Sequence, residues 1–290
     1  MRISDRQIFG RQTRLINRNR AEHARLQDQA ASGKRVSRPS DDPSAFGRIS
    51  EVNHRLAAVE GHRTNASAAR TKLQTAESAI FETTDNVARA VELTVRSLNG
   101  SLNADNRSSI AAEIRTISQH LRGVAETRLD GQYIFSGTST DTPPLASDGS
   151  YQGGGQGNLV KVGQGQPVDI AIDGSSIFAG PGNLIGLLDE LATALDANDV
   201  NAVGAKLDGL KNAQDQVINA QTDIGARISR VNLSETLSEE IDFRLQKERG
   251  ELQDADIASV ISELVSREQS LQAAVQVAGR SLQPSLLDVL

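Results

Sequence analysis

Residues 257–282 read IASVISELVSREQSLQAAVQVAGRSL, and this stretch decides the fold of the chain. Its apolar side chains recur at alternating spacings of four and three residues, with one polar interruption at Glu268. This spacing puts them on one face of a helix, the pattern of an α-helix that packs along another helix. The row consists of Ile257, Ile261, Leu264, Leu271, Val275, Ala278 and Leu282.

The opposite end of the chain carries a weaker version of the same pattern. Phe9, Ile16, Leu26 and Ala30 follow it, but polar residues fill the seam positions between them. Such a helix buries too little apolar area to offset the entropy of ordering it, so it needs a partner. We therefore predict that the protein works by assembly. The predicted interface residues are Phe9, Ile16, Leu26, Ile257, Ile261, Leu264, Leu271, Val275 and Leu282.

Composition agrees with a helical protein of this kind. Aromatic residues make up 3% of the 290 residues and Trp is absent, so large globular cores are disfavoured and long helices in thin layers are favoured. The net charge of −6 argues against nucleic-acid binding by the whole chain. The charge is uneven: residues 1–38 hold ten Lys and Arg against three acids, and residues 251–290 hold six acids against two Arg. The two ends could attract each other within or between chains.

Several functional classes are excluded or disfavoured by the residues present. The chain has no Cys, which excludes disulfides, thiol catalysis and thiolate metal sites. The N-terminus lacks the apolar segment of a secretory signal, and no run is long enough to cross a bilayer. We expect no membrane association, and any export must use a signal other than a cleaved peptide.

Turn signals divide the chain symmetrically about a central insertion. Asp42-Pro43 resembles an N-cap with Pro at the first helical position, and Asp130-Gly131 breaks a third helix that is predicted from about residue 104 to 129. We predict a mainly α fold of long antiparallel helices and terminal coiled-coil helices with a small β-rich insertion. The predicted segments are an N-terminal assembly helix and turn (1–42), the first half of a helical rod (43–129), a β-rich outer insertion (130–182), the second half of the rod (183–253) and a C-terminal assembly helix (254–290).

Possible sites for chemistry have simpler structural explanations. Adjacent Asp41 and Asp42 could form an acid/base pair or bind a cation, but helix capping explains them better. The glycines of residues 153–157 lack the Gly-Lys-Ser/Thr of a phosphate loop, and the four His lack ligand spacing. The Arg-rich N-terminus is better explained as a partner-helix face than as a transit peptide or nucleic-acid arm. We predict no catalytic residues, no cofactor, no metal and no nucleic-acid partner.

Four stretches resemble the flagellin-like family of bacterial flagellar proteins, especially the branch at the hook–filament junction. They are ASGKRVSRPSDDP at 31–43, LDGQYIFSGT at 129–138, DADIA at 254–258 and LQPSLLDVL at 282–290. The resemblance implies loosely ordered ends in the monomer, which would form an inner coiled-coil layer on assembly, and an outward-facing insertion. It also implies type III export without a cleaved signal peptide, and an extracellular place in the flagellum.

The same resemblance implies the partners. They are a homo-oligomeric ring, a neighbouring hook-associated protein on the hook side, flagellin or a junction partner on the filament side, and a flagellar export chaperone. Two alternatives stay open at this stage: the filament subunit itself, and a cytoplasmic coiled-coil scaffold with ordered ends. An enzyme is the weakest alternative, because no catalytic set is present.

Overall fold

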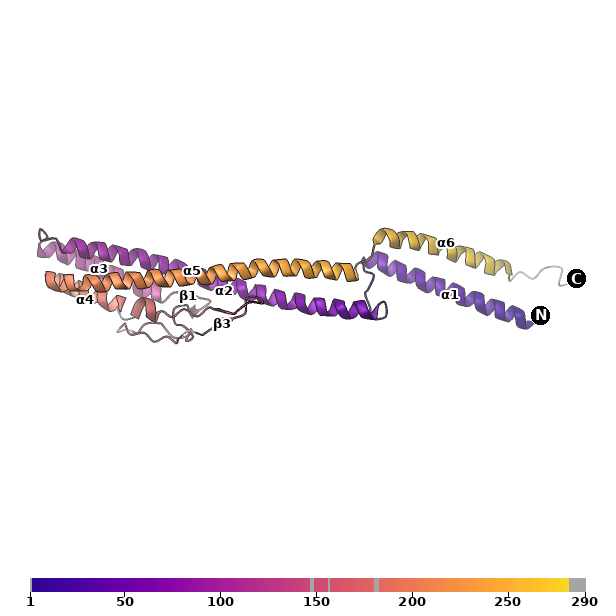
Figure 1. Cartoon of the computed structure of the whole chain (residues 1–290), viewed down its shortest axis with the longest axis horizontal. Helices are drawn as coiled ribbons and strands as arrows, with labels where there is room; N and C mark the ends of the chain where they lie inside the picture. Colours follow the sequence, from indigo (N-terminus) through magenta and orange to yellow (C-terminus); the bar gives the residue numbers. More distant parts are fainter. Residues whose placement is uncertain (1, 147–148, 156, 180–182, 282–290) are drawn as a thin grey trace. The chain divides into compact units, whose positions relative to one another are not determined.

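The computed structural model describes residues 2–146, 149–155, 157–179 and 183–281, and most of these residues are helical (Figure 1). The mainly α fold with long helices and a small insertion is confirmed. The helices are α1 (Arg2–Ser32), α2 (Pro43–Ser97), α3 (Ala104–Ala125), α4 (Leu184–Asp196), α5 (Val200–Gln253) and α6 (Ile257–Ser281).

Short polar side chains begin the helices, as their sequence positions suggest. The carboxylate of Asp42 accepts a hydrogen bond from Ala45 N at 3.0 Å, so its predicted capping role is confirmed. Asn103 caps α3 through Asn106 N, and Asp199 caps α5 through Ala202 N. Each cap satisfies one of the backbone N–H groups that a helix start leaves without a partner.

The insertion contains less strand than its sequence predicts. β1 (Arg128–Leu129) pairs antiparallel with β2 (Gln132–Tyr133), and β3 (Leu159–Val160) pairs antiparallel with β4 (Val168–Asp169). The third helix ends at Ala125 and not near Leu129, because Asp130 and Gly131, both with positive φ, turn the chain into the first hairpin. Each strand is only two residues long, and the residues that follow β2 and β4, such as Phe135 and Ile172, are buried in the core.

Side-chain packing rather than sheet holds the insertion together. The rings of Phe135 and Phe178 meet edge to face with centroids 5.3 Å apart, and both side chains are buried. Tyr151 donates its hydroxyl hydrogen to Phe135 O at 2.9 Å. Phe178 belongs to a single π-helical turn, η1 (Ser175–Ala179), which the sequence did not predict. These contacts join parts of the insertion that are distant in sequence.

Contacts divide the chain into two compact units, Val59–Ile241 and Met1–Ala58 with Asp242–Leu290. The first unit, which we call the central unit, holds the larger core. Its α3 and α4 pack together and are joined by ion pairs of Arg115 with Asp196 and of Arg122 with Asp189. Alanines along α2 are fully buried and let neighbouring helices approach closely. The buried residues of α2 and α3 include Ala66, Ala69, Leu73, Ala76, Ile80, Ile114 and Leu121.

The second unit, which we call the terminal unit, contains α1, α6 and the joined ends of α2 and α5. Here α1 and α6 lie side by side (Figure 1). A small hydrophobic cluster of Val36, Ala45 and Ile49 lies beside them, with Phe46 and Leu252 packed against it. The described residues that were predicted to act in assembly all belong to this unit.

Candidate assembly interface

The predicted interface residues occupy different environments in the free chain. Leu26 is 1% exposed, and Ile16, Leu264 and Leu271 are half-buried. By contrast, Ile257, Ile261 and Val275 remain 40%, 51% and 47% exposed. The side chain of Phe9 and the whole of Leu282 lie outside the described residues.

The side chains of α6 that were predicted as one row lie on two neighbouring faces of the helix. The less exposed face, which we call the α1-facing row, follows the spacing four, three, four, three, four. A second apolar row lies about a quarter turn away on the helix and stays open to solvent, and we call it the open stripe. The α1-facing row is Val260, Leu264, Arg267, Leu271, Ala274 and Ala278. The open stripe is Ile257, Ile261, Val265 and Val275.

The spacing of apolar residues in the sequence predicts one row and does not distinguish these two faces. Leu264 and Leu271 fit either row, and the assignment depends on which neighbour lies against α6. In the open stripe, Ile257, Ile261 and Val265 follow one another along the helix, and Glu268 and Gln272 separate them from Val275.

Charged side chains of α1 and α6 form ion pairs within their own helix. Arg25 lies 3.1 Å from Glu22, and Arg267 lies 3.6 Å from Glu263, each pair within one helix. Exposed pairs of this type add only a few tenths of a kcal/mol to a helix. The exposed arginines Arg11, Arg14, Arg18 and Arg20 keep the outer surface of α1 basic.

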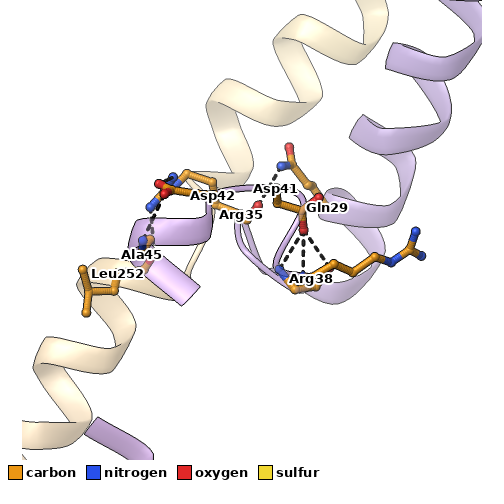
Figure 2. Close-up of polar contacts among 8 residues, drawn as sticks. Gln29, Arg35, Arg38, Asp41, Asp42, Ala45 and Leu252 are labelled. Atoms are coloured by element: carbon orange, nitrogen blue, oxygen red, sulfur yellow. Dashed lines mark hydrogen bonds and ion pairs between the residues drawn. The ribbon is translucent and has the colours of Figure 1, made fainter. Parts of the chain in front are cut away.

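A polar turn, stabilised by hydrogen bonds, connects α1 to α2 (Figure 2). The Asp41 carboxylate accepts hydrogen bonds from Ser37 N at 3.0 Å and from Arg38 N at 2.9 Å. These backbone N–H groups lower the pKa of Asp41, and the N–H of Ala45 similarly lowers the pKa of Asp42. Both aspartates therefore act as structural acceptors in this turn.

Arg35 connects this turn to the end of α5. Its guanidinium donates to Leu252 O at 2.8 Å and lies 3.4 Å from the Asp42 carboxylate (Figure 2). Gln29, the last buried residue of α1, donates its side-chain N–H to Arg35 O at 3.0 Å. Arg35, Val36 and Gln29 are not among the residues predicted from the sequence to act in assembly. Gly33, Pro39 and Pro43 mark the turn, but nothing local indicates a partner more than 200 residues away.

The described residues also bear on other kinds of site. None of the helices there is long and apolar enough to span a bilayer. The same residues hold no cluster of three His, Cys, Asp or Glu side chains that could bind a metal ion. Arg227 of α5 donates to Asp169 O and Ala171 O of the insertion and pairs with Asp223 on its own helix, so its guanidinium docks the insertion on α5.

Comparison with known proteins agrees with these features. Residues 3–140 match the family model of the bacterial flagellin N-terminal helical region. The chain is 29% identical to flagellar hook-associated protein 3 of Salmonella typhimurium over 94% of this chain and 95% of that protein. It is 23% identical to flagellin of Listeria innocua over 99% of this chain and 98% of that one.

A solved structure shares the fold. It is a flagellar hook-associated protein from Vibrio parahaemolyticus, described as putative, with a TM-score of 0.67 and 23% identity. The match covers 74% of this chain and 100% of that one. The chain thus matches the flagellin N-terminal helical family over residues 3–140 and is similar to flagellar hook-associated protein 3 over nearly its whole length.

Proposed function

We propose that this protein joins the flagellar hook to the filament, and that neighbouring copies bind one another through their terminal helices. One observation carries the proposal: α6 keeps the open stripe of Ile257, Ile261, Val265 and Val275 after α1 has covered its other face. A helix surface of this kind is suited to a second helix. The similarity to hook-associated protein 3 supports the position at the hook.

The free energy gained by burying the open stripe favours an assembly in which each copy contacts several neighbours. Complete burial of an aliphatic side chain contributes about 1.5–3 kcal/mol, so four side chains that are about half exposed would contribute about 1 kcal/mol each. That gain is smaller than the entropic cost of bringing two free copies together. Binding would therefore depend on several neighbours at once, as in a closed ring.

Charge provides a second reason for contact between copies. The basic outer surface of α1 in one copy would face the acids of α6 in the next, including Glu263 and Glu268. Such pairing orients neighbours and discourages wrong arrangements. We infer that it acts together with the open stripe to set how copies follow one another.

The remaining partners are part of the same proposal. A ring of copies would contact a hook-associated neighbour on one side and flagellin or another junction partner on the other. An export chaperone would bind the C-terminal region before export, and the protein would leave the cell without losing a signal peptide. The similarity to hook-associated protein 3 supports these roles.

The filament subunit is the second candidate, because the similarity to flagellin extends over nearly the whole chain. Deletion of the gene separates the two. For a junction protein, we expect hooks without filaments and abundant unassembled flagellin in the medium. Loss of flagellin itself would identify the chain as the filament subunit. Unchanged motility and filaments would rule out both roles.

A further inference from the structure

Arg107 carries a buried positive charge near the start of α3. Among the residues that the structure describes, it is the one charged residue that is buried, with a relative exposure of 5%. Its guanidinium donates three hydrogen bonds, and all three acceptors are uncharged oxygen atoms. Burying a charge costs free energy unless its polar hydrogens find partners, so these three oxygens decide whether the arginine is tolerated.

The three acceptors come from two turns that are distant in sequence. Nε donates to Ser97 O at 3.0 Å and Nη2 donates to Asn99 O at 3.2 Å, at the end of α2 and in the turn that follows it. Nη1 donates to Asn198 Oδ1 at 2.7 Å, in the turn between α4 and α5, which lies 91 residues from Arg107. One side chain therefore binds the turn before α3 and the turn before α5 at the same time.

The end of α2 is suited to a cation. The last carbonyl groups of a helix have no partner within the helix, and the helix dipole makes this end negative. Ser97 is 1% exposed, so its carbonyl group depends on Arg107 for the hydrogen bond that water provides at an open helix end. Without the guanidinium, this carbonyl group would be buried without a partner, which destabilises the turn.

The α4–α5 turn reaches Arg107 through a single side chain. Asn198 has a φ of 54°, the left-handed conformation that commonly follows the end of a helix. Its own N–H donates back to Leu195 O at 3.0 Å, which closes the backbone of this turn on α4. The described residues of the two turns, 98–103 and 197–199, share no hydrogen bond with each other, so Arg107 is the polar link between them.

We infer that Arg107 is a lock that makes these two turns open together as one cooperative unit. Opening of either turn withdraws an acceptor while the guanidinium stays buried, and an unpaired buried charge is strongly unfavourable. The cost of opening one turn therefore depends on the state of the other turn. The lock lies within the central unit and holds whatever the role of the chain in the flagellum.

Arg115, on the same helix, provides the comparison. Its guanidinium pairs with Asp196 at the end of α4, but the two side chains are 47% and 37% exposed. Exposed pairs of this type contribute little to stability, because water and salt screen them. Arg115→Met is thus a matched control, which removes an arginine of α3 near the α4–α5 turn and leaves the lock in place.

Hydrogen exchange of the full-length protein tests the coupling between the two turns. Asn198→Gly removes the acceptor from the α4–α5 turn, and glycine tolerates the positive φ without strain. We expect the amides of residues 98–103, in the other turn, to exchange about tenfold faster, the effect of losing a hydrogen bond to a charged group. Arg107→Met should speed exchange in both turns by a larger factor, because it removes all three bonds. Arg115→Met should change neither turn by more than about twofold.

Two results would overturn the lock. Exchange that rises only in the turn next to each substitution would mean that the two turns open independently. Equal effects of Arg115→Met and Arg107→Met would mean that an exposed ion pair matters as much as the buried arginine. Asn198→Gly keeps the arginine and all the helices, so it decides between coupled and independent turns even if Arg107→Met fails to fold.

Discussion

At the scale of single residues, one step along α6 decides which neighbour a side chain meets. Val260 is buried against α1, and the next residue, Ile261, is half exposed. Adjacent residues on a helix point about 100° apart, so they cannot share one partner. The apolar residues at 257, 261 and 275 are therefore available to a helix from outside the chain.

Ile261→Asp tests this availability. The side chain is exposed in the free protein, so we expect normal secretion and unchanged helix content, but loss of incorporation into hook-associated structures. Val277→Asp is a matched control, because Val277 is 59% exposed and lies about 160° around α6 from Ile261. Sheared flagella probed by immunoblot would measure incorporation. Equal incorporation of the two variants would exclude the open stripe as the interface.

Leu271→Asp tests a residue that fits both the α1-facing row and the open stripe of α6. Leu271 is half-buried in the α1-facing row, so a carboxylate there would disturb the terminal pair as well as any neighbouring copy. We expect secretion to continue and incorporation to stop, with both fractions measured by immunoblot. Normal incorporation of this variant would remove Leu271 from the interface.

The Asp41 carboxylate should make the turn between α1 and α2 sensitive to acid. Its pKa is lowered in the folded chain by the N–H groups of Ser37 and Arg38, so its stabilising effect is complete above the ordinary value of 3.8. That effect is lost as the pH falls below this value through the lowered pKa. The amide proton shifts of Ser37 and Arg38 should titrate together with a midpoint below 3.8, and Asp41→Asn should abolish the transition. A midpoint above 3.8 would contradict the hydrogen-bonded turn.

At the scale of elements, helix limits were predictable where strong local signals mark them. Asp42-Pro43 begins α2, and Asn103 begins α3, close to their predicted positions. The insertion was less predictable, because its packing depends on contacts between distant residues such as Phe135 and Phe178. The β-bridge between Lys34 and Asp254 could not be predicted either, because it also joins residues that are distant in sequence. The domain limits proposed from the sequence remain a prediction.

Phe135→Ala tests the packing that replaces sheet in the insertion. Removal of a fully buried ring should lower the free energy of unfolding by about 3–4 kcal/mol. Phe81→Ala is the control, since Phe81 is largely exposed on α2 and should cost less than about 0.5 kcal/mol. Urea denaturation followed by circular dichroism would measure both. Similar losses for both variants would show that the two Phe rings do not organise the insertion core.

At the scale of the whole molecule, the opposite charges of the two ends should make association between copies depend on salt. Screening shortens the reach of exposed charges from about 10 Å at 0.1 M salt to about 3 Å at 1 M. We expect the self-association of concentrated protein, measured by sedimentation, to weaken over this range. Association that strengthens with salt would mean that the open stripe dominates and that charge contributes little.

The hydrogen bonds that join the segment after α1 to the segment before α6 have a mechanical consequence. A terminal pair tethered by one polypeptide strand could swivel freely, because rotation about a few φ and ψ angles meets little resistance. Two connecting segments that are hydrogen-bonded side by side, as Arg35 and Val36 are to Gln253, resist twisting because rotation would break those bonds. A load applied to the ends of this chain would thus pass into α2 and α5 as torque instead of being lost in a loose swivel.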